Sequence, residues 1–536
     1  MKLLNQNLND PLLKEKHYTL PNYDREAVLA QTRQKPVWVH MGAGNIARSF
    51  LSQVAQDSLD SGSITTGMII CEGFDYEIIE KAYRPFDNLC INVILNADGS
   101  VKKNVVASMT ESLVMDPQRE DWTRLRELFT LPSLQMVSFT ITEKGYNLKD
   151  LKGNYMPAVL DDFAAGIAAP KTYMGKIAAL CYARYQAGAL PLALVSMDNC
   201  SHNGKRLEDA VCDFARHWVE NEIVDAGFLT YITGNEKIAF PWTAIDKITP
   251  RPDPTVHSLL TADGLDDMTP VETSRHTFVA PFVNAEQTQY LVIEDHFPNG
   301  RPNLKAQGVY FTGRATVEKF EQMKVCTCLN PLHTALAVLG CMLGYNRISD
   351  EMKDEDLAEL IHRIAFRESM PVVVDPGIID PVDFASQVIE QRLPNPFIPD
   401  TPQRIATDTS QKLAIRFGNT IRAYLADEKM DVQSLRYIPF VLAAWCRYLL
   451  AIDDSGTPFT PSADPMLAEL QTYVAGIELG SKGPFHDALQ PILSNVAIFG
   501  VDLYGVGLGE RVEQMFAELV AGPGSILTAL HTLLAD

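Results

Sequence analysis

The stretch PVWVHMGAGNIARSFLSQVAQ, residues 36–56, decides the fold of the N-terminal half. A short apolar strand at 37–41 runs into a turn with two glycines, and a helix follows from Asn45. Gly42 permits the tight turn, Gly44 lets a ligand approach the backbone, and Ala47 stands where a third glycine is usual. This order of elements seats a dinucleotide pyrophosphate on the helix N-terminus. The residues expected to contact the cofactor here are Gly42, Ala43, Gly44, Asn45, Ile46 and Arg48.

A carboxylate ends the second predicted strand, because the apolar residues 68–71 are followed by Glu72. An acid at this position accepts a hydrogen bond from the adenosine ribose 2′-hydroxyl and repels a 2′-phosphate. The pattern therefore favours NAD over NADP. Two alternatives stay open: Asp75 fills this role, or Glu72 is simply solvated.

Two further buried strands, at 136–141 and 192–196, each end in polar residues. Ligands of an open parallel sheet bind beyond the carboxyl ends of its strands. Glu143 and Asn199 are therefore expected to face the nicotinamide and the substrate. In the alternative reading, both side chains cap or tie down loops.

From about residue 316 onward the pattern is almost wholly helical, and a strand at 290–295 precedes this change. The sequence predicts an α/β Rossmann-type N-terminal domain over residues 1–290 and a mostly α-helical C-terminal domain over residues 291–536. A chain of 536 residues is too long for a single core, which agrees with two large domains.

The stretch EQMKVCTCLNPLH, residues 321–333, is the candidate centre of the chemistry. It brings a lysine (Lys324), an amide (Asn330) and an imidazole (His333) into ten residues of a helix that Pro331 is expected to break. Distorted helical turns are frequent at functional sites. Taken singly, each residue is more simply a helix start, an amide before proline or a core histidine; their combination favours a site.

Composition narrows the class of protein. The net charge of −21, with no basic run, argues against a nucleic-acid partner. The nine cysteines are odd in number and lie in apolar contexts, which fits reduced thiols in the cytosol. Cys326 and Cys328 alone are a weak metal signal, and we expect no metal. The N-terminus is too polar for a signal peptide, and no apolar run spans a bilayer, so a cytoplasmic enzyme without membrane contact is expected.

These segments together resemble the polyol-specific long-chain dehydrogenases, the mannitol dehydrogenase family. The resemblance covers nearly the whole chain in the family's order and implies an N-terminal Rossmann-type domain, a mostly helical C-terminal domain and metal-independent chemistry with NAD or NADP. The motifs that carry it are GAGNIARSF (42–50), TITEKGY (140–146), DNCSHNG (198–204), IDKITP (245–250), IEDHFPNGRP (293–302), EQMK and NPLH (321–333), and LPNP with DTSQK (393–412).

The resemblance also implies roles for individual residues. Lys324 resembles the family's general acid/base, Asn199 and Asn330 resemble the amides that polarise the reacting oxygen, and His333 resembles the imidazole that positions substrate and lysine. Glu321 resembles a carboxylate associated with proton passage to solvent. Five residues separate the lysine and the asparagine here instead of the family's usual four; a π-type bulge would accommodate the extra residue. Two further residues, Asp246 and Arg392, fall in segments that contact the distal groups of the substrate.

The substrate expected from the overall resemblance is a hexuronate, with D-fructuronate reduced to D-mannonate. Arg392, Lys412 and Arg416 are candidates for binding its carboxylate, because guanidinium groups bind carboxylates in bidentate fashion. The alternatives are a tagaturonate (D-altronate) reductase, a mannitol or other polyol 2-dehydrogenase and, outside enzymes, an NAD-sensing module. We expect a monomer or a small homo-oligomer.

Overall fold

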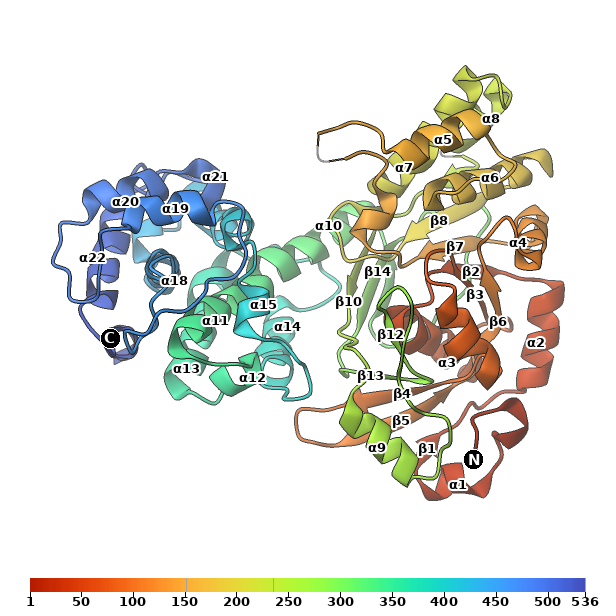
Figure 1. Cartoon of the computed structure of the whole chain (residues 1–536), viewed down its shortest axis with the longest axis horizontal. Coiled ribbons are helices and arrows are strands. Elements are labelled where there is room, and N and C mark those ends of the chain that lie inside the picture. Colours follow the sequence, from red (N-terminus) through yellow and green to blue (C-terminus); the bar gives the residue numbers. More distant parts are fainter. Residues whose placement is uncertain (151, 235, 536) are drawn as a thin grey trace. The chain divides into compact units, whose positions relative to one another are not determined.

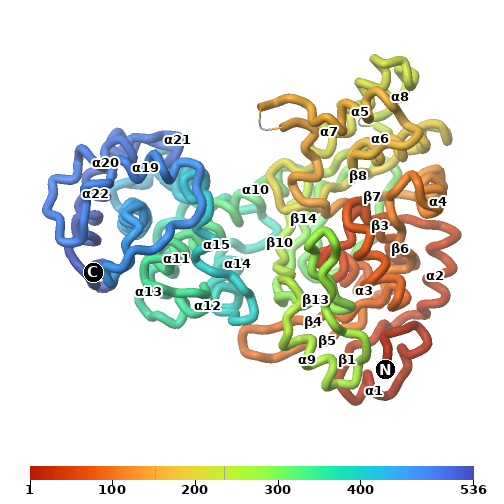
Figure 2. The backbone as a smooth tube through the Cα atoms, in the orientation of Figure 1, coloured from red at the N-terminus to blue at the C-terminus, as the bar shows by residue number. Residues whose placement is uncertain are grey.

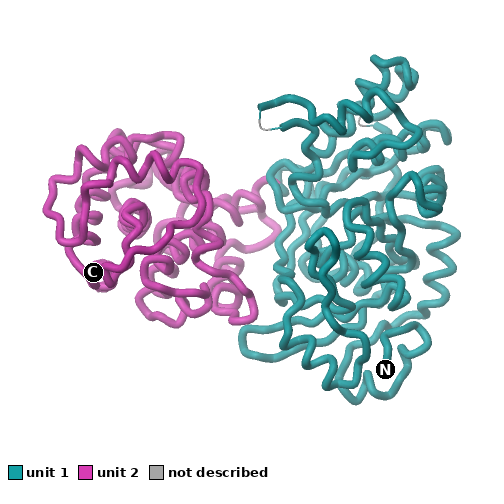
Figure 3. Tube along the Cα trace, in the orientation of Figure 1, with its two compact units in different colours: residues 1–317 teal, residues 318–536 magenta. Residues whose placement is uncertain are grey.

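The computed structural model describes residues 1–150, 152–234 and 236–535 (Figure 1). The chain divides into two compact units, Met1–Val317 and Glu318–Asp536, which Figure 3 colours separately. Unit 1 holds the sheets, whereas unit 2 contains only helices among its described residues.

A six-stranded parallel sheet organises unit 1, with strand order β6-β3-β2-β7-β8-β9. The order reverses direction between β2 and β7, which is the switch point where doubly wound sheets bind dinucleotides. The registers pair Met41 with Cys71 and with Phe139, so β2, β3 and β7 end at one edge. The strands are β2 (Trp38–Met41), β3 (Met68–Glu72), β6 (Met109–Val114), β7 (Met136–Phe139), β8 (Leu192–Ser196) and β9 (Ile238–Ala239).

Both faces of this sheet are covered, because every residue of β2, β3, β7 and β8 is buried. Val39 and Met41 join a core with the helices of one face, and Trp38 joins a second core on the other face. Near-continuous apolar runs are what strands buried on two sides require. The first face packs against α4 (Glu120–Thr130), α6 (Tyr173–Gln186) and α7 (Asn203–Glu220); the second packs against η2 (Ala47–Leu51), α3 (Ser52–Asp60) and the smaller sheets.

Three smaller sheets, of four, three and two strands, complete unit 1, and the two larger of them bring together segments that are distant in sequence (Figure 2). β13 (Phe282–Ala285) pairs in parallel with β4 (Cys90–Leu95), and β1 (Tyr18–Thr19) pairs with β5 (Val101–Val106). The three-stranded sheet has the order β10-β14-β15, in which β14 (Tyr290–Glu294) pairs with β10 (Thr243–Asp246) and β15 (Val309–Thr312). A domain boundary at 290/291 would cut β14; the compact units instead meet at 317/318, because the pairing holds residues 290–312 to unit 1.

Unit 2 is built around two buried helices, α11 (Asn330–Leu343) and α18 (Tyr437–Tyr448), which pack on one another. All twelve residues of α18 are buried, and the carboxylate of Glu368 accepts the backbone N–H groups of Tyr437 (2.8 Å) and Ile438 (2.7 Å) at its start. A buried acid there satisfies donors that the first helical turn leaves unpaired. The surrounding helices include α13 (Glu355–Arg363), α14 (Pro381–Gln387), α17 (Gly418–Ala426), α19 (Leu467–Val474), α20 (His486–Leu493), α22 (Gly509–Leu519) and α23 (Ser525–Ala535).

The helical run Arg314–Leu343 is, in the described part of the chain, the one helix whose length and mean hydropathy would suit a membrane span. Most of its apolar window, 78%, is buried inside the protein. Burial of this kind is the property of a core helix, since its apolar side chains already have protein neighbours.

Candidate functional site

The glycine turn after β2 has the conformation that its sequence predicts. Gly42 has a φ of +114°, and a Cβ there would lie 2.2 Å from the carbonyl oxygen of Thr140, so no other residue fits. A Cβ on Gly44 would meet nothing within 4 Å. Packing inside the protein therefore does not require glycine at position 44, whereas close approach of a phosphate group to the backbone would require it.

Glu72 is anchored to the glycine turn by its carboxylate. One oxygen accepts the Ala43 N–H at 2.8 Å, and the other accepts the N–H groups of Phe74 (2.8 Å) and Asp75 (3.1 Å). The side chain is buried, so Glu72 is not simply solvated. Burial raises its pKa, against the opposing effect of the three N–H donors. The hydroxyl of Tyr83 donates to the Ala43 carbonyl at 2.9 Å, so both backbone groups of Ala43 are held.

Arg48, a predicted phosphate contact, lies beneath the turn. It is 1% exposed, and its guanidinium donates to the carbonyl of Ala280 and to Asn45 Oδ1. Asn45 in turn donates to the carbonyl of Pro250 at 2.9 Å. Arg48 is buried and Asn45 is half-buried, and their hydrogen bonds give both side chains a structural role at the start of the helix that the sequence motif alone did not reveal.

Asp198, which the sequence did not single out, ties the ends of β7 and β8 together. Its carboxylate accepts the N–H groups of Ile141 and Thr142, both at 2.9 Å, and the hydroxyl of Tyr146 at 2.6 Å. Burial raises its pKa, and these hydrogen bonds oppose the rise. The signal for it was a lone acid directly after an apolar strand, in the motif DNCSHNG.

The two predicted residues of this edge have different surroundings. Asn199 follows Asp198 and is exposed. Glu143 begins a 3-10 turn, is about half exposed, and forms an ion pair with Arg206 of α7 at 2.9 Å. Glu143 thus ties a loop to a helix, as in the alternative reading of the sequence. Asp246, predicted near the substrate, is the buried last residue of β10.

In unit 2, Lys324 begins the π-helical segment Lys324–Cys328, which separates α10 (Arg314–Met323) from α11. The Leu329 N–H donates to the Lys324 carbonyl at 3.1 Å, five residues back, as a π turn requires. The bulge expected for the extra residue is thus confirmed. Lys324 itself is buried. Glu321 is half-buried one turn earlier, in the last turn of α10.

The helix break lies at Leu329, not at Pro331. Leu329 leaves helical geometry, with φ −129° and ψ −63°, and α11 begins anew at Asn330. Pro331 occupies the first turn of α11, where its missing N–H costs nothing. A proline inside a helix clashes with the carbonyl four residues back, here that of Thr327. The chain has already left helical geometry at Leu329, so this clash does not arise.

His333 lies in the first turn of α11, with its Nε2 3.4 Å from the Asp400 carboxylate. Burial lowers the pKa of His333 to about 4; Asp400 opposes this shift, and Arg416, Arg404 and Arg392 add to it. The imidazole is therefore neutral near pH 7. Asp400 also forms an ion pair with Arg404.

Cationic groups gather around this turn. Arg416 donates to the hydroxyl of Thr334, which itself donates to the Asn330 carbonyl at 2.9 Å. Burial lowers the pKa of Arg416 to about 10. Arg392 is the buried last residue of a π-helical segment, Val388–Arg392. Lys412 donates to the carbonyls of Ile405 and Thr407, and burial followed by the charge of Arg416 lowers its pKa.

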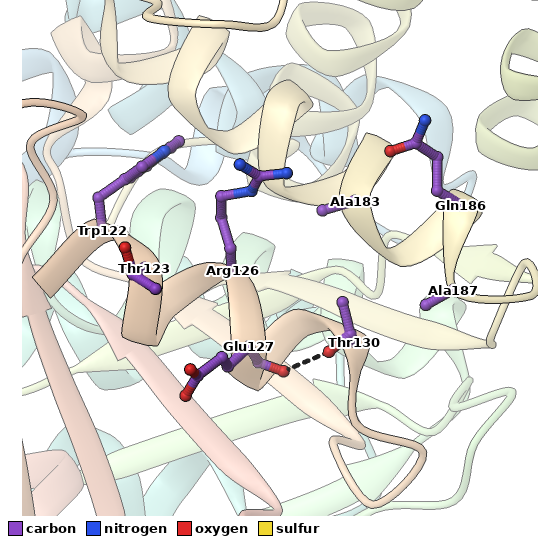
Figure 4. A pocket seen from close by; sticks show the side chains of 8 residues that line it. All are labelled: Trp122, Thr123, Arg126, Glu127, Thr130, Ala183, Gln186 and Ala187. Atoms are coloured by element: carbon purple, nitrogen blue, oxygen red, sulfur yellow. Dashed lines mark hydrogen bonds between the residues drawn. The ribbon is translucent and has the colours of Figure 1, made fainter. Parts of the chain in front are cut away.

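Unit 1 carries a groove on its surface (Figure 4). It is lined by Trp122, Arg126 and Glu127 of α4 and by Ala183 and Gln186 of α6. Both helices end here and lead into the starts of β7 and β8, so the groove lies at the edge opposite the glycine turn. Within residues 1–150, 152–234 and 236–535, no three His, Cys, Asp or Glu side chains form a group that could hold a metal ion.

Comparisons with known proteins show what each part of the chain is similar to. A model of the mannitol dehydrogenase Rossmann domain matches residues 36–306, and one of the mannitol dehydrogenase C-terminal domain matches residues 316–520. D-mannonate oxidoreductase of Thermotoga maritima is 48% identical over 534 residues, covering 99% of this chain and 98% of that protein. Mannitol 2-dehydrogenase of Cereibacter sphaeroides is 30% identical over 466 residues, covering 84% and 87%.

Solved structures show the same architecture. The Pseudomonas fluorescens mannitol 2-dehydrogenase, in ternary complex with NAD and D-mannitol, aligns over the full length of both chains with a TM-score of 0.69 and 26% identity. D-sorbitol dehydrogenase in substrate-free form aligns over 96% of this chain and 100% of that chain, with a TM-score of 0.76 and 23% identity. The second likeness is one of fold.

Proposed function

The chain belongs to the mannitol dehydrogenase family, and from this premise we propose that it reduces the ketone of D-fructuronate to the alcohol of D-mannonate, reversibly, with NAD as cofactor. The observation that carries the proposal is the 48% identity with a D-mannonate oxidoreductase over nearly the full length of both chains. Mannitol 2-dehydrogenases match at 30% identity or less. We place the enzyme in the cytoplasm, as a monomer or a small homo-oligomer.

The residues of the switch point fit NAD. Gly44 leaves its backbone open to a pyrophosphate, and the helix from Asn45 presents unpaired N–H groups to it. Glu72 offers a fixed carboxylate to the adenosine ribose hydroxyls, and its charge disfavours the 2′-phosphate of NADP. NAD, when bound, accepts or supplies the hydride.

The proton is moved by Lys324 in this proposal. In reduction its ammonium group protonates the carbonyl oxygen of the substrate, and in oxidation its amine accepts the proton of the alcohol. The carboxamides of Asn199 and Asn330 donate hydrogen bonds to the same oxygen, where negative charge develops. His333 is neutral, so it orients the substrate and the lysine without adding charge. Glu321 returns the proton to solvent.

The charges around His333 favour a sugar acid over a neutral polyol. The charges of Arg416, Arg404 and Arg392 lower the pKa of His333, and the charge of Asp400 raises it. An anionic substrate gains from such a surplus of positive charge, and a guanidinium group binds its carboxylate in bidentate fashion. Arg392 is our first choice for this contact, because its guanidinium presents paired donors that match a carboxylate, which the ammonium group of Lys412 does not.

A parallel assay tests the substrate. NADH oxidation is followed with D-fructuronate, D-tagaturonate and D-fructose at equal concentrations, and we expect the highest kcat/KM with D-fructuronate. Preference for tagaturonate would assign a D-altronate-forming reductase, and turnover with fructose alone would assign a polyol 2-dehydrogenase. Tight NADH binding without turnover of any ketose would instead indicate a nucleotide-sensing module.

A further inference from the structure

Phe74 is an exposed aromatic ring on a segment of unit 1 that is otherwise tightly held. It is 63% exposed, the largest exposed fraction among the large hydrophobic side chains of the described residues. Its own N–H donates to Glu72 at 2.8 Å. A Cβ at the preceding Gly73 would lie 2.4 Å from Met115 and 2.6 Å from the ring of Tyr173, so the backbone before Phe74 is packed from both sides. A fixed, exposed ring beside a ligand site indicates a contact surface.

A second segment reaches the same place. The turn between β11 (Val271–Glu272) and β12 (Phe278–Val279) docks on the residues that follow Phe74. The Thr273 hydroxyl donates to Asp75 Oδ2 at 2.6 Å, and the Ser274 N–H donates to Glu77 at 3.0 Å. These contacts bring the guanidinium of Arg275 to 5.0 Å from the centre of the Phe74 ring. A cation over one face of the ring fixes its orientation and leaves the other face available.

The position of Phe74 determines which ligand group it meets. Glu72, two residues earlier, is the carboxylate proposed to bind the adenosine ribose. Its Oε1 accepts the Phe74 N–H, and its Oε2 accepts the Ala43 N–H of the glycine turn. The adenine base is attached to that same ribose. Asp75 Oδ1 is buried without a hydrogen-bond partner, so this segment also retains an acceptor that the protein leaves unused.

We infer that Phe74 is the stacking platform for the adenine of NAD, and that Arg275 is a positioning residue that holds the ring from its other face. The inference rests on the proposed function, since it deepens the cofactor site of that reaction. Stacking of a base on an aromatic ring is worth about 1–3 kcal/mol, or roughly 5- to 150-fold in affinity. Phe74, which lies outside the glycine motif, would then contribute this part of the affinity for NAD.

The experiment compares two ligands that differ by the adenosine. Dissociation constants for NADH and for reduced nicotinamide mononucleotide, which lacks the adenosine, are measured for the full-length protein and for Phe74→Ala, Phe74→Tyr and Arg275→Ala. We expect Phe74→Ala to weaken NADH binding by roughly 5- to 150-fold and to leave mononucleotide binding unchanged. Phe74→Tyr should bind NADH as the parent does, and Arg275→Ala should show a smaller loss. The control is Leu160→Ala, another large apolar side chain, 51% exposed on α5 (Pro157–Ala165).

The outcomes separate this inference from the proposed function. NADH binding by Phe74→Ala as tight as that of the parent would overturn the inference and leave the function intact. An equal loss for both ligands would also overturn it, because the effect would then not come from the adenine. A parent protein that binds no NADH would refute the proposed function and the inference together.

Discussion

Polar groups are held in place differently at the end of the parallel sheet in unit 1 and at the helix break in unit 2. In unit 1, buried carboxylates accept backbone N–H groups, and these bonds fix the loops: Glu72 holds the glycine turn and Asp198 holds the ends of β7 and β8. In unit 2, Lys324 and Asn330 are placed by a π turn and a fresh helix start, and the charges nearby are mainly cationic.

This difference matches the division of labour in the proposed reaction. A cofactor that stays bound by its phosphates and ribose needs loops that keep one shape, which paired buried acids provide. Proton transfer needs a group that can give up and take back a proton, and binding of an anionic substrate needs cationic groups such as the arginines around His333. Variants that separate NADH binding from turnover therefore test the comparison directly.

The largest effect is expected from Lys324→Ala. Loss of the group that moves the proton should lower kcat/KM for ketone reduction by roughly 10²- to 10⁴-fold, while NADH binding stays at the parent level. Steady-state kinetics and a fluorescence titration with NADH give both values. Lys319→Ala, an exposed lysine of α10, is the matched control. Equal activity of the two variants would remove Lys324 from the mechanism.

Asn330→Ala should have the next largest effect. One donor to the developing oxyanion is typically worth about 2.7–4 kcal/mol, so kcat should fall by roughly 10²- to 10³-fold with little change in the KM for NADH. Asn346→Ala, an exposed amide beyond the end of α11, serves as the control. A change in KM alone would indicate that Asn330 only binds the substrate.

The two glycines of the turn should respond differently to alanine. Gly42→Ala should lower the free energy of unfolding by more than about 1 kcal/mol, because its φ is positive and its Cβ would meet Thr140. Gly44→Ala should leave unfolding unchanged but raise the Kd for NADH by about tenfold, or 1.4 kcal/mol. Urea unfolding and NADH titration of both variants measure the difference. Unchanged NADH affinity in Gly44→Ala would place the pyrophosphate elsewhere.

The smallest effect concerns pH. The pKa of His333 falls from 6.5 to about 4 in the folded protein, so below pH 6.5 the unfolded chain binds a proton that the folded one does not. Stability should therefore decrease as pH falls from about 6.5 to about 4, by on the order of 1–3 kcal/mol. His333→Gln should reduce this slope, whereas His276→Gln, on an exposed side chain, should not. An identical slope in both variants would contradict the burial argument.

His40 is a buried histidine of unit 1 that should also make the stability of the protein depend on pH. It is fully buried, with its ring nitrogens 2.7 Å from the Ser138 hydroxyl and 2.9 Å from the Thr140 hydroxyl. Burial lowers its pKa to about 3. The acid sensitivity that remains in His333→Gln should therefore come in part from His40.

The parts of the fold that depend on local pattern could be predicted from the sequence. Four of the six strands of the large sheet (β2, β3, β7 and β8), the glycine turn and the change to helices after residue 316 appear in the structure near their predicted positions. The π turn was expected from the resemblance, because five residues separate Lys324 and Asn330 instead of the family's usual four. Each of these signals lies within about ten residues, so no knowledge of distant partners is needed.

The features that depend on distant partners could not be predicted. Residues 290–312 belong to unit 1 because β14 pairs with β10, some 45 residues earlier, and periodicity does not reveal such pairing. Arg48 has the position in the glycine motif of a residue that contacts phosphate, but its guanidinium donates to the carbonyl of Ala280. The role of Asp198 could not be predicted, because its carboxylate accepts the N–H groups of Ile141 and Thr142, which belong to another loop.

The burial of the cysteines has a practical consequence. Eight of the nine are buried, and Cys200 is the exception, directly after Asn199 at the edge of the sheet. A maleimide dye added to the folded protein should therefore react at one position per chain. Its emission would report nucleotide binding without any engineered attachment point.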